Sequence, residues 1–267
     1  MNMMVSVMTR LEAIAQLTAA EQPYELVPGK IWGRDCRVFK QAPPTLRDLF
    51  ESTRSDETYL IYEQERYSFS ESWQRASQIA TVLVNDCGIK KGDRVAISMR
   101  NYPEWTLAFS AITSIGAVAV AMNALWTAEE MRYGLENSGA KVLFADQERV
   151  DRLLPMIDEL SVKLVAVRPQ QVLPAAVANL ADLVGQYPGV DMPAAELSMN
   201  DPATILYTSG STGYPKGAVS CHGNILTALM SWELEGQIAT TLSGVAPEEV
   251  PYQAATLLAV PLFHATG

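Results

Sequence analysis

Three short apolar runs decide the fold: RVAISM at residues 94–99, AVAVA at 117–121 and KVLFAD at 141–146. None of them shows the strict apolar–polar alternation of a strand with one wet face. Continuous apolar runs of this length are typical of strands that are covered on both faces, as in parallel sheets. The three runs therefore predict the central strands of a buried sheet.

Helices separate these strands. Pro103 fits the first turn of a helix that runs to about Ser114, because the first helical residue needs no N–H donor. Thr127 and Glu130 have the spacing of a capping box that begins a second helix, which ends near Gly139. Strands that alternate with helices predict an α/β fold with mostly parallel sheets and helices on both faces.

Toward the N-terminus the helical pattern continues. Apolar residues recur at helical spacing from Ser70, a predicted cap, to Gly88, a predicted left-handed turn after the helix. Residues 58–68 predict a small hairpin, and residues 45–54 predict a helix. Residues 1–44 contain four prolines and predict a short helix and an irregular arm.

Toward the C-terminus the alternation is less regular. Residues 147–160 predict a helix, residues 163–167 a strand, and a proline-rich stretch then includes a weak helix at 175–184. The remaining elements expected are a strand at 203–207, a helix from about Asn224 and a strand at 255–260. The predicted parts of the chain are an N-terminal arm (1–44), a first α/β subdomain (45–200) and the start of a second α/β subdomain (201–267).

Composition narrows the class of protein. The 267 residues are 48% apolar and 19% charged, which indicates a folded chain with a large core. A net charge of −10 disfavours nucleic acids and anionic membranes as partners. Three scattered cysteines and two histidines offer no zinc-ligand spacing, so we predict no metal site and reduced thiols in a cytoplasmic protein.

Residues 105–128 carry no charge and are long enough to cross a bilayer. They are rich in Ala, Ser and Thr, and Gly116 divides them. We therefore interpret them as a helix, a glycine turn and a buried strand rather than a membrane span. The first 26 residues lack the pattern of a secretory signal.

The most informative segment is ILYTSGSTGYPKGA at residues 205–218, where an apolar strand runs into a loop rich in glycine and hydroxyls. Glycines allow successive backbone N–H groups to turn toward an anion, and hydroxyls add further donors. Lys216 adds a mobile positive charge. This combination favours the phosphates of a nucleotide.

Other glycine-loop motifs do not fit the segment. A Walker A loop needs Gly-Lys followed by Ser or Thr, but Pro215 precedes Lys216 and Gly217 follows it. The loop contains no Gly-x-Gly-x-x-Gly, so it is not a dinucleotide fingerprint. It also lacks the Gly-x-Ser-x-Gly of a hydrolase nucleophile elbow. Fast ATP hydrolysis without any acid would be needed to favour a P-loop NTPase or kinase.

The string TSGSTGYPKG, followed by His222 and Asn224, resembles the phosphate-loop signature of the adenylate-forming superfamily, which includes acyl-CoA synthetases, luciferases and adenylation domains. The resemblance covers about residues 45–267 and implies the N-terminal domain of such an enzyme. It implies that the β- and γ-phosphates of ATP are bound by Thr208, Ser209, Gly210, Ser211, Thr212, Gly213, Lys216 and Gly217.

PLFHATG at residues 261–267 is similar to the next motif of that superfamily. The resemblance places Phe263 and His264 at the pocket for the acyl substrate. The alternative for His264 is a partly buried histidine at a helix start. NYPEW at residues 101–105 also looks like the family, and there we expect residues that build the fold.

The resemblance implies a reaction in two halves: a carboxylate attacks Mg·ATP to give acyl-AMP and pyrophosphate, and the thiol of coenzyme A then displaces AMP. It also implies later motifs for magnesium, ribose and a mobile lid, none of which falls within residues 1–267. The chain is therefore expected to be an N-terminal fragment of an acyl-CoA synthetase for a fatty or other hydrophobic acid, without its C-terminal lid domain and without a catalytic residue of its own.

Such a fragment is expected not to adenylate alone, and acid-dependent ATP–pyrophosphate exchange by residues 1–267 would contradict this expectation. The alternative is a truncated paralogue that binds a nucleotide or a protein partner without catalysis. Amino-acid adenylation domains remain open within the superfamily, and the sequence also leaves homo-oligomerisation open.

Overall fold

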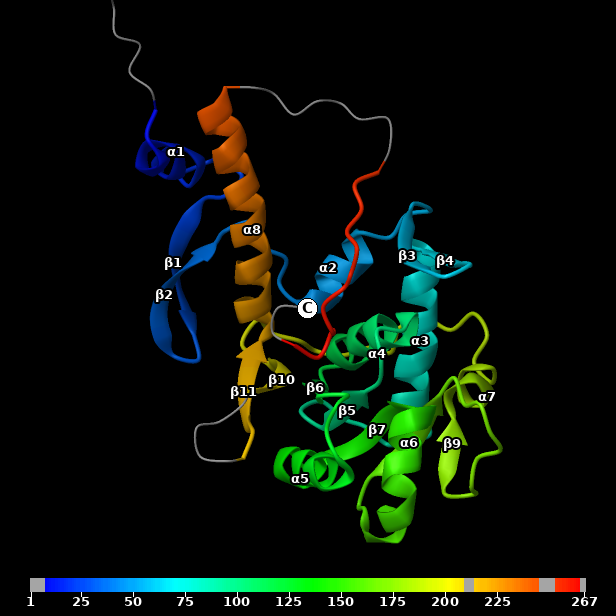
Figure 1. Cartoon of the computed structure of the whole chain (residues 1–267). Coiled ribbons are helices and arrows are strands. Elements are labelled where there is room, and N and C mark those ends of the chain that lie inside the picture. The colour runs from blue at the N-terminus through cyan, green and yellow to red at the C-terminus, as the bar shows by residue number, and fades with distance from the viewer. Residues whose placement is uncertain (1–7, 209–213, 245–252, 265–267) are drawn as a thin grey trace, which may run out of the picture.

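A computed structural model describes residues 8–208, 214–244 and 253–264 (Figure 1). Its strands are β1 (Leu26–Ile31), β2 (Arg34–Phe39), β3 (Thr58–Tyr62), β4 (Glu65–Ser68), β5 (Arg94–Ser98), β6 (Val118–Ala121), β7 (Ala140–Asp146), β8 (Lys163–Val167), β9 (Val177–Asn179), β10 (Pro202–Thr208) and β11 (Lys216–Cys221). Its helices are α1 (Arg10–Leu17), α2 (Leu46–Ser52), α3 (Phe69–Asn85), α4 (Pro103–Ser114), α5 (Ala128–Ser138), α6 (Gln147–Leu153), the 3₁₀ helix η1 (Leu154–Glu159), α7 (Leu180–Val184) and α8 (His222–Ser243).

Seven strands form the central sheet, in the order β11-β10-β6-β5-β7-β8-β9. Every neighbouring pair in this sheet is parallel except β10 and β11, which are antiparallel. β1 with β2 and β3 with β4 form two separate antiparallel hairpins. The mostly parallel α/β fold expected from the sequence is confirmed.

Helices cover both faces of the sheet, and the strand side chains alternate between two cores. Val95 and Ile97 of β5 lie in a core with residues of α3 and α4. Ala96, between them, lies in a second core with Met131 and Leu135 of α5. All these residues are almost completely buried, which explains why the strands are apolar on both faces.

Side-chain caps set the helix boundaries. The Thr127–Glu130 capping box is confirmed, and Gly139 ends α5 with φ 61°. The predicted cap Ser70 is wrong, because Ser68 and Glu71 form the capping box that begins α3. In that box the Ser68 N–H donates to the Glu71 carboxylate at 2.8 Å. Gly88 follows α3 in the predicted left-handed conformation, with φ 66°.

The N-terminal arm is more ordered than expected. The short helix is present as α1, but residues 26–39 form a β-hairpin instead of an irregular chain. Its two turn residues, Trp32 and Gly33, have φ 49° and 75°, the combination that two-residue hairpins with the favoured twist require. Asn200 anchors this turn, since its Oδ1 accepts from the Trp32 N–H at 2.9 Å. The hairpin lies beside α8 (Figure 1).

Three other expectations need correction. The helix expected at 147–160 ends at Leu153 and continues as η1, because Pro155 cannot donate within an α-helix. Residues 175–184 form the short strand β9 and then α7, since Asn179 caps a helix that begins at Leu180. The strand expected at 255–260 is absent from the described residues, where this segment pairs with no neighbouring strand.

The central sheet continues across residue 200, where two subdomains were expected to meet. β10 pairs in parallel with β6, with Thr204 opposite Ala119 and Leu206 opposite Ala121. The loop-bearing hairpin of β10 and β11 therefore extends the sheet that β5 to β9 form. The division of the chain at residue 200 stays a prediction.

The uncharged segment 105–128 contains most of α4, a turn at Gly116 and the strand β6, as expected. Among the described residues, no helix is both long enough and apolar enough to span a bilayer.

Gly116→Ala is expected to lower the free energy of unfolding by about 1–3 kcal/mol. Gly116 has φ 75°, and a Cβ there would lie 2.8 Å from Leu197 Cδ2. Gly236→Ala is the matched control, because Gly236 lies inside α8 with nothing within 4 Å of its Cβ position. The control should be neutral or gain up to about 1 kcal/mol. Urea titrations would measure both changes, and equal midpoints for the two variants would contradict the prediction.

Candidate active site

The antiparallel strands β10 and β11 hold the two ends of the glycine-rich loop. Thr208 at the end of β10 is opposite Lys216 at the start of β11. The Thr208 hydroxyl donates to the Lys216 carbonyl oxygen at 3.4 Å. Both residues are exposed, so a hydroxyl and an ammonium group stand at the base of the loop. Five of the predicted phosphate-binding residues lie outside the described part of the chain: Ser209, Gly210, Ser211, Thr212 and Gly213.

Gly217 has a packing reason to be glycine. It pairs with Tyr207 across the two strands, and a Cβ at Gly217 would lie 2.7 Å from Ile205 Cγ2. A larger residue would push β11 away from β10. The predicted contact between Gly217 and phosphate remains a prediction.

Helix α5 supports the C-terminal side of the loop. The Tyr133 hydroxyl donates to the Pro215 carbonyl oxygen at 3.2 Å, and the rings of Tyr133 and Tyr214 are 5.1 Å apart. The Tyr207 hydroxyl contacts the Asn137 side-chain oxygen at 2.8 Å. These contacts attach the residues next to Lys216 to the second helical layer.

The loop leaves the sheet at the edge where the parallel strands have their carboxyl ends. In the register of β10 with β6 and of β6 with β5, Thr208 is level with Asn123 and Met99. β10 and β5 are two strands apart, which is about 10 Å across the sheet. Ligands of open α/β sheets bind beyond this edge.

The second predicted motif lies at the same edge. Asn101, just beyond the end of β5, donates from Nδ2 to the Val260 carbonyl oxygen at 2.8 Å. Its Oδ1 accepts from the Leu262 N–H at 2.9 Å. Leu262 and Phe263 are half-buried against the core that contains α4, and His264 is exposed. The described ends of the glycine-rich loop, Thr208 and Lys216, and the described residues 261–264 of the second motif therefore lie at the same edge of one sheet.

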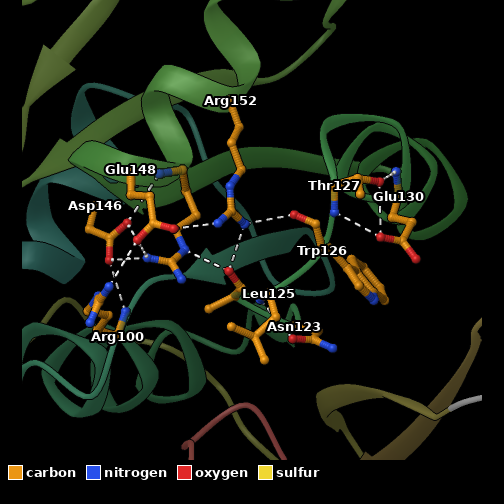
Figure 2. A network of polar contacts seen from close by, with 11 residues as sticks. Arg100, Asn123, Leu125, Trp126, Thr127, Glu130, Asp146, Glu148 and Arg152 are labelled. Carbon is orange, nitrogen blue, oxygen red and sulfur yellow. Dashed lines mark hydrogen bonds and ion pairs between the residues drawn. The ribbon is translucent and has the colours of Figure 1, made fainter.

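A network of charged residues lies beyond the ends of the neighbouring strands β5 and β7 (Figure 2). Asp146, at the end of β7, accepts from the Arg100 N–H at 3.0 Å and from Arg149 Nη1 at 3.1 Å. Glu148 contacts Arg100, Arg149 and Arg152. Both carboxylates are therefore paired with arginines, so we interpret this network as structural.

His222 and Asn224, which follow the loop in sequence, have structural roles in this fold. Asn224 Oδ1 accepts from the Cys221 N–H at 3.1 Å and thereby caps α8. His222 is fully buried at the first position of α8. Its Nδ1 accepts from the Leu46 N–H at 3.1 Å, so it links the start of α8 to the start of α2. Sequence reasoning had no signal for this link, because it joins residues 176 positions apart.

The stability of the fold should fall as the pH drops below about 6.5, the ordinary pKa of histidine. Burial lowers the pKa of His222, so the unfolded chain takes up this proton at a higher pH than the folded chain. The contribution of neutral His222 to stability is therefore fully present above the pKa that the histidine has in the unfolded chain. It is lost as the pH falls toward the pKa of His222 in the folded chain. His222→Gln should flatten this part of the stability–pH curve, measured by urea unfolding between pH 5 and 8. An unchanged curve would contradict the assignment.

Within residues 8–208, 214–244 and 253–264, no three His, Cys, Asp or Glu side chains gather so as to hold a metal ion. The magnesium ligand expected for this reaction was predicted to lie beyond Gly267, and that prediction is untested.

The chain matches the AMP-binding enzyme family over residues 48–267. It is 31% identical to a 2-succinylbenzoate–CoA ligase of Bacillus velezensis over 78% of this chain and 37% of that protein. It is 34% identical to a long-chain-fatty-acid–CoA ligase of Mycobacterium tuberculosis over 74% of this chain and 36% of that protein. The chain thus spans little more than a third of these relatives' length.

Solved structures of similar fold support the same family assignment. A putative long-chain-fatty-acid–CoA ligase of Rhodopseudomonas palustris superimposes with a TM-score of 0.66 and 26% identity, covering 82% of this chain and 52% of that one. An anthranilate–CoA ligase in complex with anthranoyl-AMP gives a TM-score of 0.62 and 25% identity, covering 67% of this chain and 35% of that one. The fold, the loop and the matched residues together show that this chain belongs to the AMP-binding enzyme family.

Proposed function

We propose that the protein is an ATP-dependent acyl-CoA synthetase, which activates a fatty or other hydrophobic carboxylic acid as acyl-AMP and transfers the acyl group to coenzyme A. The observation that carries the proposal is that the base of the glycine-rich loop and the segment before Phe263 lie at the same edge of the sheet, where the parallel strands end. Thr208 and Lys216 stand at the base of the loop, and Asn101 holds the segment that leads to Phe263 and His264.

The donor chemistry of the loop suits a polyphosphate. The exposed Thr208 hydroxyl and Lys216 ammonium group can bind phosphate oxygens, and the loop glycines supply further backbone N–H groups. In the proposed first step, a carboxylate oxygen bonds to the α-phosphorus and pyrophosphate leaves. In the second, the coenzyme A sulfur bonds to the acyl carbon and AMP leaves. The residues of this chain contribute positioning and charge neutralisation, without a protein nucleophile.

The proposal of a hydrophobic acid is supported by the character of the second motif. Leu262 and Phe263 are apolar and only half-buried, so they offer apolar surface next to His264. The relatives named above are ligases of a long-chain fatty acid and of two aromatic acids, each of which includes a hydrocarbon chain or ring. We further propose an enzyme that uses magnesium with ATP. We also propose that it is cytoplasmic, which fits Cys36, Cys87 and Cys221 forming no disulfide with one another.

An acid panel with the whole protein tests this function. Fatty acids of several lengths, benzoates and amino acids would each be incubated with Mg·ATP and coenzyme A, and AMP and acyl-CoA would be quantified. Acid-dependent formation of both products with a hydrophobic acid is expected. ATP binding without AMP release from any acid would overturn the proposal and favour the non-catalytic nucleotide-binding alternative.

A further inference from the structure

We infer that Asn101 is a positioning residue for the acyl-substrate pocket: its side-chain amide fixes the C-terminal part of the segment 253–264 to the edge of the sheet. The inference rests on the proposed function. Asn101 lies in the motif NYPEW, which the sequence led us to interpret as part of the fold only.

The geometry of the contact is that of a strand neighbour. In a parallel sheet, a residue of one strand bonds to the two residues that flank its partner on the next strand. It donates its N–H to the C=O of the residue before the partner, and its C=O accepts from the N–H of the residue after the partner. Asn101 does the same around Pro261: it donates to the Val260 carbonyl at 2.8 Å and accepts from the Leu262 N–H at 2.9 Å. At residues 260–262 a single side-chain amide thereby makes the two hydrogen bonds that a neighbouring strand would make.

Asparagine suits this position because its amide carries a donor and an acceptor on one planar group. Aspartate at 101 would keep the acceptor for Leu262 but would place a second acceptor against the Val260 carbonyl. Alanine would remove both bonds.

The residues next to Asn101 are held rigidly. Arg168 bonds to both oxygens of Glu65 at 2.7 Å and to Glu104 at 2.9 Å. Its guanidinium also lies 5.3 Å from the ring centroid of Tyr102. The Arg168 contact lowers the pKa of Glu65 to about 2, so this ion pair persists through neutral and mildly acidic pH. Asn101 therefore extends from a fixed part of the chain.

A second anchor holds the other end of the segment. Gln253 Nε2 donates to the Thr58 carbonyl oxygen in β3 at 2.9 Å. Glu65, the Arg168 partner, lies in β4 of the same hairpin. The segment is thus attached at residues 253 and 260–262 to one connected frame, and Phe263 and His264 follow directly after the second attachment.

This arrangement predicts that substitution of Asn101 changes the KM of the acid rather than the KM of ATP. Release of the segment would displace Phe263 and His264, whereas the phosphate loop is held separately by β10, β11 and α5. Small displacements of groups that orient a substrate reduce catalysis strongly.

The test compares Asn101→Ala and Asn101→Asp with Asn200→Ala in the whole protein. Asn200 is the matched control, because its side-chain oxygen also accepts from a distant backbone N–H, that of Trp32 in the N-terminal hairpin. The first measurement is hydrogen exchange on peptides that span residues 253–264. In Asn101→Ala the Leu262 N–H should exchange about tenfold faster, because it loses its one hydrogen bond to the side chain. Asn101→Asp should still protect Leu262, and the control should match the wild type.

The second measurement is steady-state kinetics with the preferred acid. Asn101→Ala should raise the KM of the acid about tenfold and leave the KM of ATP unchanged, with Asn101→Asp in between. Unchanged exchange and unchanged acid KM in Asn101→Ala, or an equal rise in both KM values, would overturn the inference. If the wild type forms no acyl-CoA from any acid, the proposed function fails, and the exchange measurement alone still decides whether Asn101 anchors the segment.

Discussion

Replacing Arg149 by leucine is expected to lower the free energy of unfolding by about 3–5 kcal/mol, because it leaves a buried carboxylate without its partner. The side chains of Arg149 and Asp146 are only 3% and 5% exposed. Arg149 Nη1 bonds to both Asp146 oxygens, and its Nε donates to the Ala124 carbonyl oxygen at 2.7 Å. The carboxylate cannot move into water, since it also caps α6 and binds the Arg100 N–H.

The control for this prediction is Arg100→Ala. The Arg100 side chain is 66% exposed and pairs at 3.2 Å with Glu148, which is 45% exposed (Figure 2), so its loss should cost less than about 1 kcal/mol. Chemical denaturation of the three proteins would measure the changes. The double variant Asp146→Leu with Arg149→Leu should recover part of the loss, because no unpaired charge stays buried. A loss below 1 kcal/mol in Arg149→Leu would show that the pair is dispensable.

Lys216→Ala in the whole protein is expected to reduce kcat/KM for ATP by about 10²–10³, the usual effect of removing one preorganised group that stabilises transition-state charge. The ammonium group stands at the base of the loop, opposite Thr208, and among the described residues no ion pair occupies it. In the proposed reaction, this charge would neutralise phosphate during attack on the α-phosphorus. Lys216→Arg should retain part of the activity, since it keeps the charge but changes its geometry.

Lys30→Ala serves as the control for Lys216. Lys30 lies on β1, where it pairs with Asp35 at 3.4 Å and is 68% exposed. Its removal should leave acid-dependent ATP–pyrophosphate exchange unchanged. Exchange by Lys216→Ala at the wild-type rate would exclude a role for this lysine in the first half-reaction.

The central fold could be predicted because its signals are local. Apolar runs such as residues 94–99 mark doubly covered strands, and the Thr127–Glu130 spacing marks a helix start within one turn. The arm was misjudged for the opposite reason. Pro28 discouraged a strand, but it lies in an isolated two-stranded hairpin whose edge tolerates a missing N–H. The hairpin turn also depends on a positive φ at Trp32, which no composition rule indicates.

In the candidate site, too, local features could be predicted from the sequence and long-range contacts could not. The order of residues 208–217 indicated a phosphate loop without any tertiary information. The role inferred for Asn101 could not be predicted, since its partners lie 159 and 161 residues away. His222 was noted as part of a motif, but only the fold shows that it accepts from Leu46. Long-range contacts of single polar side chains leave no periodic trace in a sequence.

The pairing of β10 with β6 also constrains how the chain is made. Thr204 hydrogen-bonds to Ala119, which precedes it by 85 residues. During synthesis at about 5–20 residues per second, the outer edge of β6 therefore waits roughly 4–17 seconds for its partner to leave the ribosome. An open, apolar strand edge invites pairing with other chains during that interval. The nascent chain consequently exposes this strand edge until the β10–β11 hairpin is translated, and a chaperone that covers the edge would protect the chain during that interval.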